Sequence, residues 1–263
     1  MGIKNLAAVL TKQKKFLSLF NLKIDEIPKG YVIVKMEYSG ICHTQLNEIN
    51  GILGKDKFIP HCMGHEGVGK IVKKGTGVKN FKIGDRVVVS WIKKKTKTNY
   101  KSIKYYYNNK TINSGGCNTL LQYSLVSDNR IYKLSLKNKY FKESILLGCA
   151  LPTATSAILK ISKIYKNSKV LIMGMGGLGY SCLFALNYLN CKNIVCIDNN
   201  SKKLNLMNKS RHINFMKINK KNIGNFLNKN HEKFDVIIDC TGSKSLIEQT
   251  FSLCKKFRGK FII

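Results

Sequence analysis

The chain has 263 residues, of which 44% are hydrophobic and 10% aromatic. This is enough for one large domain or two ordinary ones and excludes a disordered chain. Its 46 Lys and Arg residues outnumber 14 Asp and Glu residues, for a formal net charge of +32. Such a charge attracts polyanions. However, only four of the basic residues are Arg, the side chain preferred for bidentate recognition of bases and phosphates. We therefore expect a solvated lysine surface and no nucleic-acid partner.

Targeting signals are not evident. The segment MGIKNLAAVLTKQKKF at the start lacks the apolar core of a signal peptide, and no stretch reaches the ~18 apolar residues of a membrane span. The nine Cys residues show no spacing typical of a disulfide framework. The five in the second half lie in apolar or helical-looking segments, where a thiol packs as a small hydrophobe. We expect a cytoplasmic protein without a membrane partner.

The sequence up to about residue 150 predicts a β-rich domain. Short alternating segments at 31–41, 67–75 and 85–92 are separated by Gly, Asp and Lys turns. Residues 93–113 are polar, basic and rich in Tyr, without a clear period. We expect a surface excursion there.

The pattern changes after Gly148, where apolar strands begin to alternate with helices. The expected helices cover 150–164, 178–190, 201–210 and 245–256, and the expected strands cover 169–174, 193–198, 234–242 and 259–263. This alternation predicts a doubly wound parallel sheet. The predicted fold is therefore α/β, with a β-rich domain over 1–150 and a nucleotide-binding domain over 151–263.

The segment GMGGLG at 174–179 fits the G-x-G-x-x-G pattern. It follows the apolar strand KVLIM directly and opens a helix, which is the context that gives this pattern meaning. Gly174 and Gly176 permit a tight turn and let the backbone approach a pyrophosphate, and Gly179 lets the helix pack close to the strand. The N–H groups at the helix start would then face the phosphates.

Asp198 closes the next predicted strand. A carboxylate there accepts hydrogen bonds from the adenosine ribose and repels a 2′-phosphate, so the sequence favours NAD over NADP. The nearby Lys202 and Lys203 act in the opposite direction, since a cation screens a phosphate.

Three short segments hold candidate metal ligands, namely GICHT (40–44), GHEGVG (64–69) and GCALPT (148–153). Cys42 and Cys149 offer thiolates and His65 an imidazole, which is the ligand set of a catalytic zinc with an open fourth position. Glu66 follows His65 and can lie beside the metal. The ligands are far apart in the sequence, so spacing alone leaves unrelated Cys and His residues equally open.

In these segments the chain resembles the zinc-containing medium-chain alcohol dehydrogenases, and the resemblance extends over essentially its whole length. G-D-R-V at 84–87 and the glycine-rich 174–179 segment belong to the same ordered set of motifs. The resemblance implies a GroES-like catalytic domain joined to a Rossmann domain. It also implies hydride transfer between a primary or secondary alcohol and NAD. S-Hydroxymethylglutathione, aryl alcohols and polyols all remain open as substrates.

The resemblance also implies roles for individual residues. One catalytic zinc would be held by Cys42, His65 and Cys149, with Glu66 behind it. Thr44 would take the alcohol proton through a relay with the nicotinamide ribose. The remaining residues would contact the cofactor: His43 at the pyrophosphate, Thr153 and Leu178 at the nicotinamide, Asp198 and Lys203 at the adenosine ribose, and Gly174, Gly176, Gly177 and Gly179 in the loop.

Several positions depart from the family pattern. The region at 93–116, where many members bind a second zinc through four Cys, contains none, so we predict no structural zinc. Asn47 replaces a His that ends the proton relay. Gln45 replaces an Asp that orients the zinc-binding His; its amide oxygen can still accept the imidazole N–H.

The chain ends at Ile263, within a predicted strand. Relatives continue with strands that complete the sheet and form the interface of a homo-oligomer. We therefore expect an incomplete sheet and negligible alcohol oxidation by the 263 residues alone. Two alternatives stay open: a fragment that binds nucleotide without turnover, and, less favoured, a nucleic-acid binder using Tyr105, Tyr106 and Tyr107.

Overall fold

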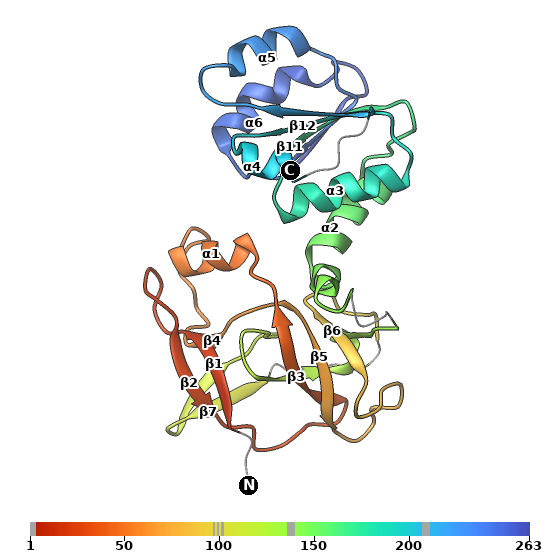
Figure 1. Cartoon of the computed structure of the whole chain (residues 1–263). Coiled ribbons are helices and arrows are strands. Elements are labelled where there is room, and N and C mark those ends of the chain that lie inside the picture. Colours follow the sequence, from red (N-terminus) through yellow and green to blue (C-terminus); the bar gives the residue numbers. More distant parts are fainter. Residues whose placement is uncertain (1–3, 97, 99, 101–102, 136–139, 207–210) are drawn as a thin grey trace. The chain divides into compact units, whose positions relative to one another are not determined.

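The computed structural model describes residues 4–96, 98, 100, 103–135, 140–206 and 211–263. The chain divides into two compact units, Met1–Cys149 and Ala150–Ile263 (Figure 1). None of the helices in the described ranges is long and apolar enough to cross a membrane.

The first unit contains two five-stranded sheets, with strand orders β2-β1-β4-β8-β7 and β10-β6-β5-β3-β9. The strands are β1 (Asn5–Leu10), β2 (Ser18–Leu22), β3 (Tyr31–Ser39), β4 (His61–Cys62), β5 (Glu66–Lys74), β6 (Arg86–Ser90), β7 (Lys104–Tyr107), β8 (Lys110–Asn113), β9 (Tyr123–Ser127) and β10 (Ile131–Lys133). Helix α1 (His43–Asn50) follows β3, and the 3₁₀ segment η3 (Glu143–Gly148) ends the unit.

Strand β3 separates two hydrophobic cores. Tyr31 and Ile33 pack into one cluster, whereas Val32 and Val34 pack into another. Successive side chains of a strand point to opposite faces, so a strand covered on both faces needs an unbroken apolar run. This explains why the segment YVIV lacks the polar alternation of a half-exposed strand.

The predicted surface excursion at 93–113 is wrong for residues 104–113, which form the antiparallel hairpin β7–β8. Asn108 and Asn109 form its turn with left-handed φ angles of 46° and 61°, a conformation that Asn tolerates. Tyr105 is fully buried; its hydroxyl donates to Asn118 Oδ1 (2.9 Å) and accepts from the Leu125 amide (3.0 Å). Other parts of the predicted excursion, at 97, 99 and 101–102, lie outside the described residues.

The second unit is a doubly wound parallel sheet, which confirms the predicted α/β fold class. The strand order is β13-β12-β11-β14-β15, so the chain direction across the sheet reverses between β11 and β14. The strands are β11 (Lys169–Met173), β12 (Asn193–Asp198), β13 (Ile213–Lys217), β14 (Val236–Asp239) and β15 (Lys260–Ile262). In such sheets, ligands bind at the carboxyl ends of the strands beside this switch point.

Helices cover both faces of this sheet (Figure 1). They are α2 (Ala150–Ser156), α3 (Gly177–Tyr188), α4 (Ser201–Asn205), α5 (Ile223–Asn230) and α6 (Lys244–Thr250), with a π-helical turn η4 at Ala157–Ile161 and a 3₁₀ turn η5 at Phe251–Leu253. The helix predicted over 150–164 therefore ends early, and the end of the one predicted over 201–210 lies outside the described residues.

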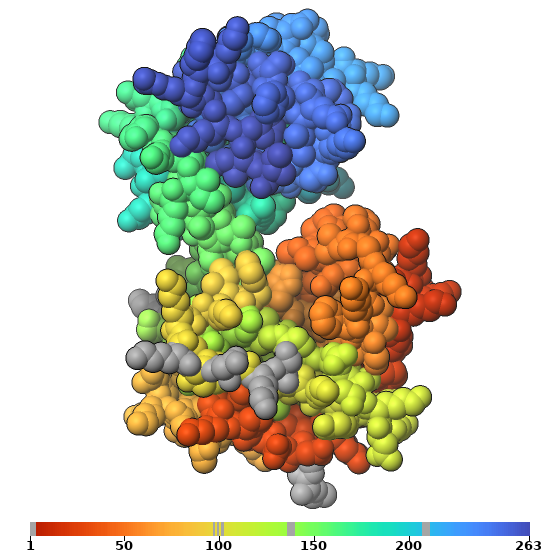
Figure 2. All heavy atoms as spheres, turned by 180° about the vertical axis from the view of Figure 1, so that it is seen from behind, coloured from red at the N-terminus to blue at the C-terminus, as the bar shows by residue number. Residues whose placement is uncertain are grey.

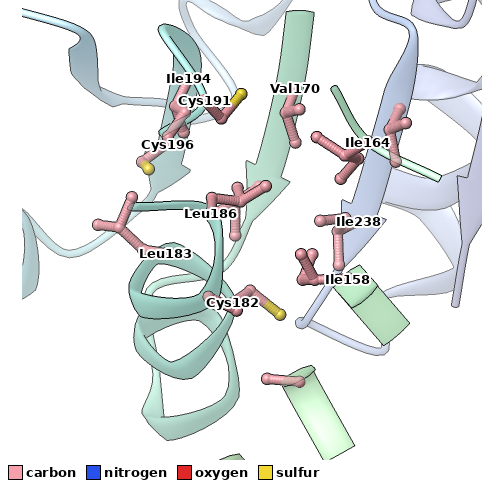
Figure 3. Packing of buried hydrophobic residues seen from close by; sticks show 14 of the residues in the cluster. Ile158, Ile164, Val170, Cys182, Leu183, Leu186, Cys191, Ile194, Cys196 and Ile238 are labelled. Carbon is pink, nitrogen blue, oxygen red and sulfur yellow. The ribbon is translucent and has the colours of Figure 1, made fainter. Parts of the chain in front are cut away.

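The core of this unit is built on the central strand β11. Val170 and Ile172 pack against α3, whereas Leu171 and Met173 belong to the cluster on the opposite face. Figure 3 shows Leu186 of α3 beside Val170 of this strand. The thiols of Cys182 and Cys196 are almost fully buried in the same cluster, as expected for Cys acting as a small hydrophobe.

Tyr105→Phe tests the buried hydrogen bonds that hold the β7–β8 hairpin. The change leaves Asn118 Oδ1 and the Leu125 amide without this partner, so we expect a loss of about 1–3 kcal/mol in the free energy of unfolding. Urea denaturation measures it. Tyr106→Phe, at a side chain that is 42% exposed, is the matched control and should change little. Equal effects of the two changes would contradict the interpretation.

Candidate functional site

The structure brings three of the predicted ligands together within the first unit. Cys42 precedes α1, His65 lies between β4 and β5, and Cys149 follows η3. One ligand atom from each lies within 4.8 Å of the other two, and all three residues are partly buried. Elsewhere in the described part of the chain, no three such ligands lie so close together.

The start of α1 fixes the position of Cys42. Cys42 is the N-cap of the helix, and its sulfur accepts a hydrogen bond from the backbone N–H of Gln45. The Gln45 side chain accepts in return from the Cys42 amide through Oε1, at 2.8 Å. Backbone N–H groups at a helix start favour an ionised sulfur, so the local fold prepares Cys42 as a thiolate.

Gln45 departs from the predicted role. It was expected to accept the N–H of His65, but Oε1 serves the Cys42 backbone instead. The side chain is 2% exposed, and Nε2 has no hydrogen-bond partner among the described residues. Gln45 therefore orients the Cys42 ligand.

Glycine residues allow the other two ligands to approach. Gly64 has a φ of +95°, and a Cβ there would lie 2.5 Å from the Thr119 hydroxyl. A Cβ on Gly148 would lie 2.7 Å from Cβ of Glu66. The Gly148 carbonyl accepts a 2.6 Å bond from the Ser90 hydroxyl, which fixes the backbone just before Cys149.

The three ligands interact electrostatically. Hydrogen bonds from Cys149 and His65 lower the pKa of Cys42 to about 3. The contact with Cys42 and burial raise the pKa of Cys149, and the Cys42 sulfur raises that of His65. Without a cation the cluster thus favours one thiolate, because a second negative sulfur nearby costs Coulomb energy. A divalent cation removes that cost.

The separations fit a metal. Zinc bound tetrahedrally at ~2.3 Å to sulfur and ~2.0 Å to nitrogen has ligand atoms roughly 3.5 Å apart. The three ligand atoms lie within 4.8 Å of one another, which is close enough for one ion to contact all three. Glu66 lies next to His65 at the start of β5 and is 6% exposed, so its carboxyl group is buried beside the cluster.

Thr44 and His43 form the first turn of α1, and both are exposed. The Thr44 hydroxyl lies 3.7 Å from the Cys42 sulfur, which places a proton-carrying group directly beside the ligand cluster. No described contact ties the His43 side chain to the cluster. Asn47 is half-buried one turn further along the same helix.

The glycine-rich turn lies in the second unit, between β11 and α3. Gly174 adopts a φ of +89°, and a Cβ on Gly179 would lie 2.0 Å from the Gly174 carbonyl oxygen. A Cβ on Gly176 or Gly177 would meet nothing within 4 Å. Gly174 and Gly179 thus need to be glycine for the fold, whereas Gly176 and Gly177 border open space at the start of the helix.

Asp198 connects this turn to the end of β12. Its carboxylate accepts from the Met175 amide at 2.7 Å and from the Asn200 amide at 2.8 Å. Lys203 Nζ lies 3.7 Å from the same group. Sequence reasoning did not find the role of Met175, because a backbone amide leaves no signal in the residue type.

The remaining two predicted cofactor residues also lie in the second unit. Thr153 is exposed on α2. Leu178 is partly buried at the start of α3 and packs against the core on that face of the sheet. The two lie on different helices, and no described contact joins them.

The chain was compared with known proteins. Residues 28–136 match the family model of the alcohol dehydrogenase GroES-like domain. An S-(hydroxymethyl)glutathione dehydrogenase of Escherichia coli is 26% identical over 228 residues, covering 78% of this chain and 61% of the relative. One from Komagataella pastoris is 28% identical over 295 residues, covering 99% of this chain and 76% of the relative. The chain thus spans less than two thirds of the E. coli relative.

Solved structures share the fold. An alcohol dehydrogenase zinc-binding domain protein from Burkholderia ambifaria superposes with a TM-score of 0.82 at 18% identity, covering 99% of this chain and 76% of that one. Benzyl alcohol dehydrogenase from Acinetobacter calcoaceticus superposes with a TM-score of 0.77 at 22% identity, covering 99% and 77%.

Gly179→Ala should destabilise the second unit by about 2–3 kcal/mol, because its methyl group would overlap a backbone carbonyl oxygen that cannot move freely. Thermal unfolding measures the change. Gly176→Ala is the matched control. It adds the same methyl group to open space and should stay within about 0.5 kcal/mol of the unchanged protein. Equal stability of the two variants would contradict tight packing at Gly179.

Proposed function

We propose that this chain, which belongs to the medium-chain alcohol dehydrogenase family, transfers a hydride between an alcohol and NAD at one bound zinc ion. The observation that carries the proposal is the Cys-His-Cys cluster, with its ligand atoms within 4.8 Å of one another. Two thiolates and one imidazole leave a fourth coordination position for the substrate oxygen.

Metal binding and proton transfer fall to different residues of the first unit. Cys42, His65 and Cys149 hold the zinc, which when bound supplies a Lewis acid that lowers the pKa of the alcohol. Thr44, 3.7 Å from the Cys42 sulfur, accepts the alcohol proton. Asn47 cannot titrate near neutral pH and so does not end a proton relay; with a cofactor bound, its ribose hydroxyl and water would be left to carry the proton away.

The second unit holds the cofactor. The open backbone at Gly176 and Gly177 receives the pyrophosphate at the start of α3. Asp198 and Lys203 bind the adenosine ribose; the Asp198 carboxylate keeps further lone pairs beyond the two amides that it accepts. Thr153 and Leu178 pack against the nicotinamide.

S-(Hydroxymethyl)glutathione is the first substrate to test, and aryl alcohols and polyols follow. The curated relatives carry that substrate in their names. S-(Hydroxymethyl)glutathione is also an anionic peptide derivative, and a chain with a net charge of +32 attracts anions as they approach it.

Metal analysis and turnover test this function together. Purified protein should contain close to one zinc per chain, and Cys149→Ser should lose it, since a hydroxyl is a poor zinc ligand. Cys254→Ser, at a thiol outside the cluster, should keep the metal. Two tightly bound zinc ions would contradict the single site.

Alcohol-dependent NADH formation is then measured on the chain and on a version extended by the C-terminal segment of a relative. We expect NADH formation by the extended version, and this formation should require both zinc and Cys149. A zinc-loaded, folded protein that forms no NADH in either version, with any of the three substrate classes, would contradict the enzyme function.

Asp198→Asn should narrow the preference for NAD over NADP. In the unchanged protein the carboxylate repels the 2′-phosphate, and removing its charge removes that repulsion. Isothermal titration with both dinucleotides measures the two affinities. Asp235→Asn is the control for net charge, since Asp235 pairs with Lys255 instead. Tighter binding of NADP by the unchanged protein would show that Lys202 and Lys203 govern the site.

A further inference from the structure

Two loops of the first unit lie side by side on its surface: residues 11–17, between β1 and β2, and residues 51–58, between α1 and β4. The Lys14 amide donates to the Ile49 carbonyl at 2.6 Å. Gln13 Nε2 donates to the Gly54 carbonyl at 2.9 Å, and its Oε1 accepts from the Asp56 amide at 3.3 Å. Figure 2 shows the red and orange segments in contact. We name them the basic–apolar loop pair.

The loop pair carries a strong positive charge. Its exposed cations are Lys12, Lys14, Lys15, Lys55 and Lys57. The single acid within the two loops is Asp56, whose carboxylate accepts from His61 Nε2 and from the Phe58 amide, both at 2.8 Å. Asp56 offsets one of these five positive charges, so the loop pair keeps a clear excess of lysine charge.

Large apolar side chains stand among these lysines. Phe16 is 99% exposed, and Ile52, Leu53 and Phe58 are each at least 65% exposed. Scattered exposed hydrophobic residues are ordinary, but four on two adjoining loops form a patch that water solvates poorly.

Hydrogen bonds fix the backbone of the two loops. Lys14 holds a left-handed φ of 60° with its amide bonded to α1, and Gln13 bridges the second loop. The apolar side chains are therefore presented from an ordered platform, which lowers the entropy lost on binding.

We propose that the basic–apolar loop pair docks onto an anionic lipid surface. Lysine ammonium groups pair with lipid phosphates and carboxylates, while apolar side chains between them enter the boundary of the acyl chains. Such docking needs no spanning helix, so the absence of a long apolar run, from which we predicted no membrane partner, does not bear on it.

Two other occupants fit less well. Neither loop contains Arg, and Ile52 and Leu53 have no ring to stack on bases, so a nucleic acid would leave half of the patch unused. A second copy of the same loops would bring lysines against lysines, which repel one another.

Vesicle sedimentation with the full chain tests the proposal. We expect binding to vesicles of phosphatidylcholine with phosphatidylserine and little binding to phosphatidylcholine alone. Replacing Phe16 and Phe58 by Ser should weaken binding at least about tenfold, since each ring buries apolar area. Replacing Lys12, Lys15, Lys55 and Lys57 by Gln should weaken it by a similar factor or more.

Phe257→Ser is the matched control, because Phe257 is 81% exposed and flanked by basic residues but belongs to the second unit, outside the basic–apolar loop pair. It should leave binding unchanged, and circular dichroism should show all variants folded. Binding that ignores the Phe16 and Phe58 changes, or that Phe257→Ser weakens equally, would overturn the proposal. So would tighter binding to single-stranded RNA that depends on the same loops.

Discussion

The arrangement of the metal cluster depends on close packing around Glu66. A Cβ on Gly40 would lie 2.7 Å from the Glu66 carboxyl oxygen, and one on Gly148 would lie 2.7 Å from Glu66 Cβ. Gly40 and Gly148 precede Cys42 and Cys149 in the chain, and the lack of a side chain lets the backbone before each thiol lie against Glu66. Gly64, which precedes His65, instead packs against Thr119 and Leu120, where a Cβ would lie 2.5 Å from the Thr119 hydroxyl.

The carboxylate of Asp198 plays a comparable part in the second unit. It binds the Met175 amide within the glycine-rich turn and the Asn200 amide just before α4, so it joins the two places where a dinucleotide would bind. The charge that we propose selects the cofactor therefore also holds the turn in shape. A change at this residue alters both properties, which is why a surface carboxylate is needed as its control.

The sequence predicted the parallel sheet of the second unit but missed β13 and α5, and it predicted the first unit less completely. The runs KVLIM, NIVCID and FDVIID are continuous and apolar, as strands buried on both faces must be, so periodicity and the alternation with helices identified a parallel sheet. The segments at 5–10, 18–22 and 104–113 mix apolar with polar or basic residues. Strands β7 and β8 pair with each other across Asn108 and Asn109, but β8 joins its sheet through His61 of β4, which is distant in the sequence. Local pattern has no access to such pairing.

The candidate site, too, could be predicted only in part from the sequence. The spacing of Cys42, His65 and Cys149 left unrelated residues equally open, and only the resemblance to a family favoured their convergence, which the geometry then shows. Gln45 illustrates the limit of that transfer. Its side chain is longer by one methylene than that of Asp, and it binds the Cys42 backbone in a capping interaction instead of the His65 ring that the resemblance implied as its partner.

The net charge of +32 shows why composition alone assigns no partner. A lysine excess spread over a surface gives a long-range field that steers any anion and selects none. Selectivity requires a second kind of contact at a fixed place, such as an aromatic ring, a shaped pocket or an ordered backbone. In the first unit, the hydrogen bonds of Gln13 and Lys14 fix the loop that carries exposed Phe16 among lysines. The general attraction for anions is thereby joined to an apolar contact at one defined place. The Cys-His-Cys cluster is built in the same way, from three ligand atoms within 4.8 Å of one another whose backbone is positioned by hydrogen bonds and glycines.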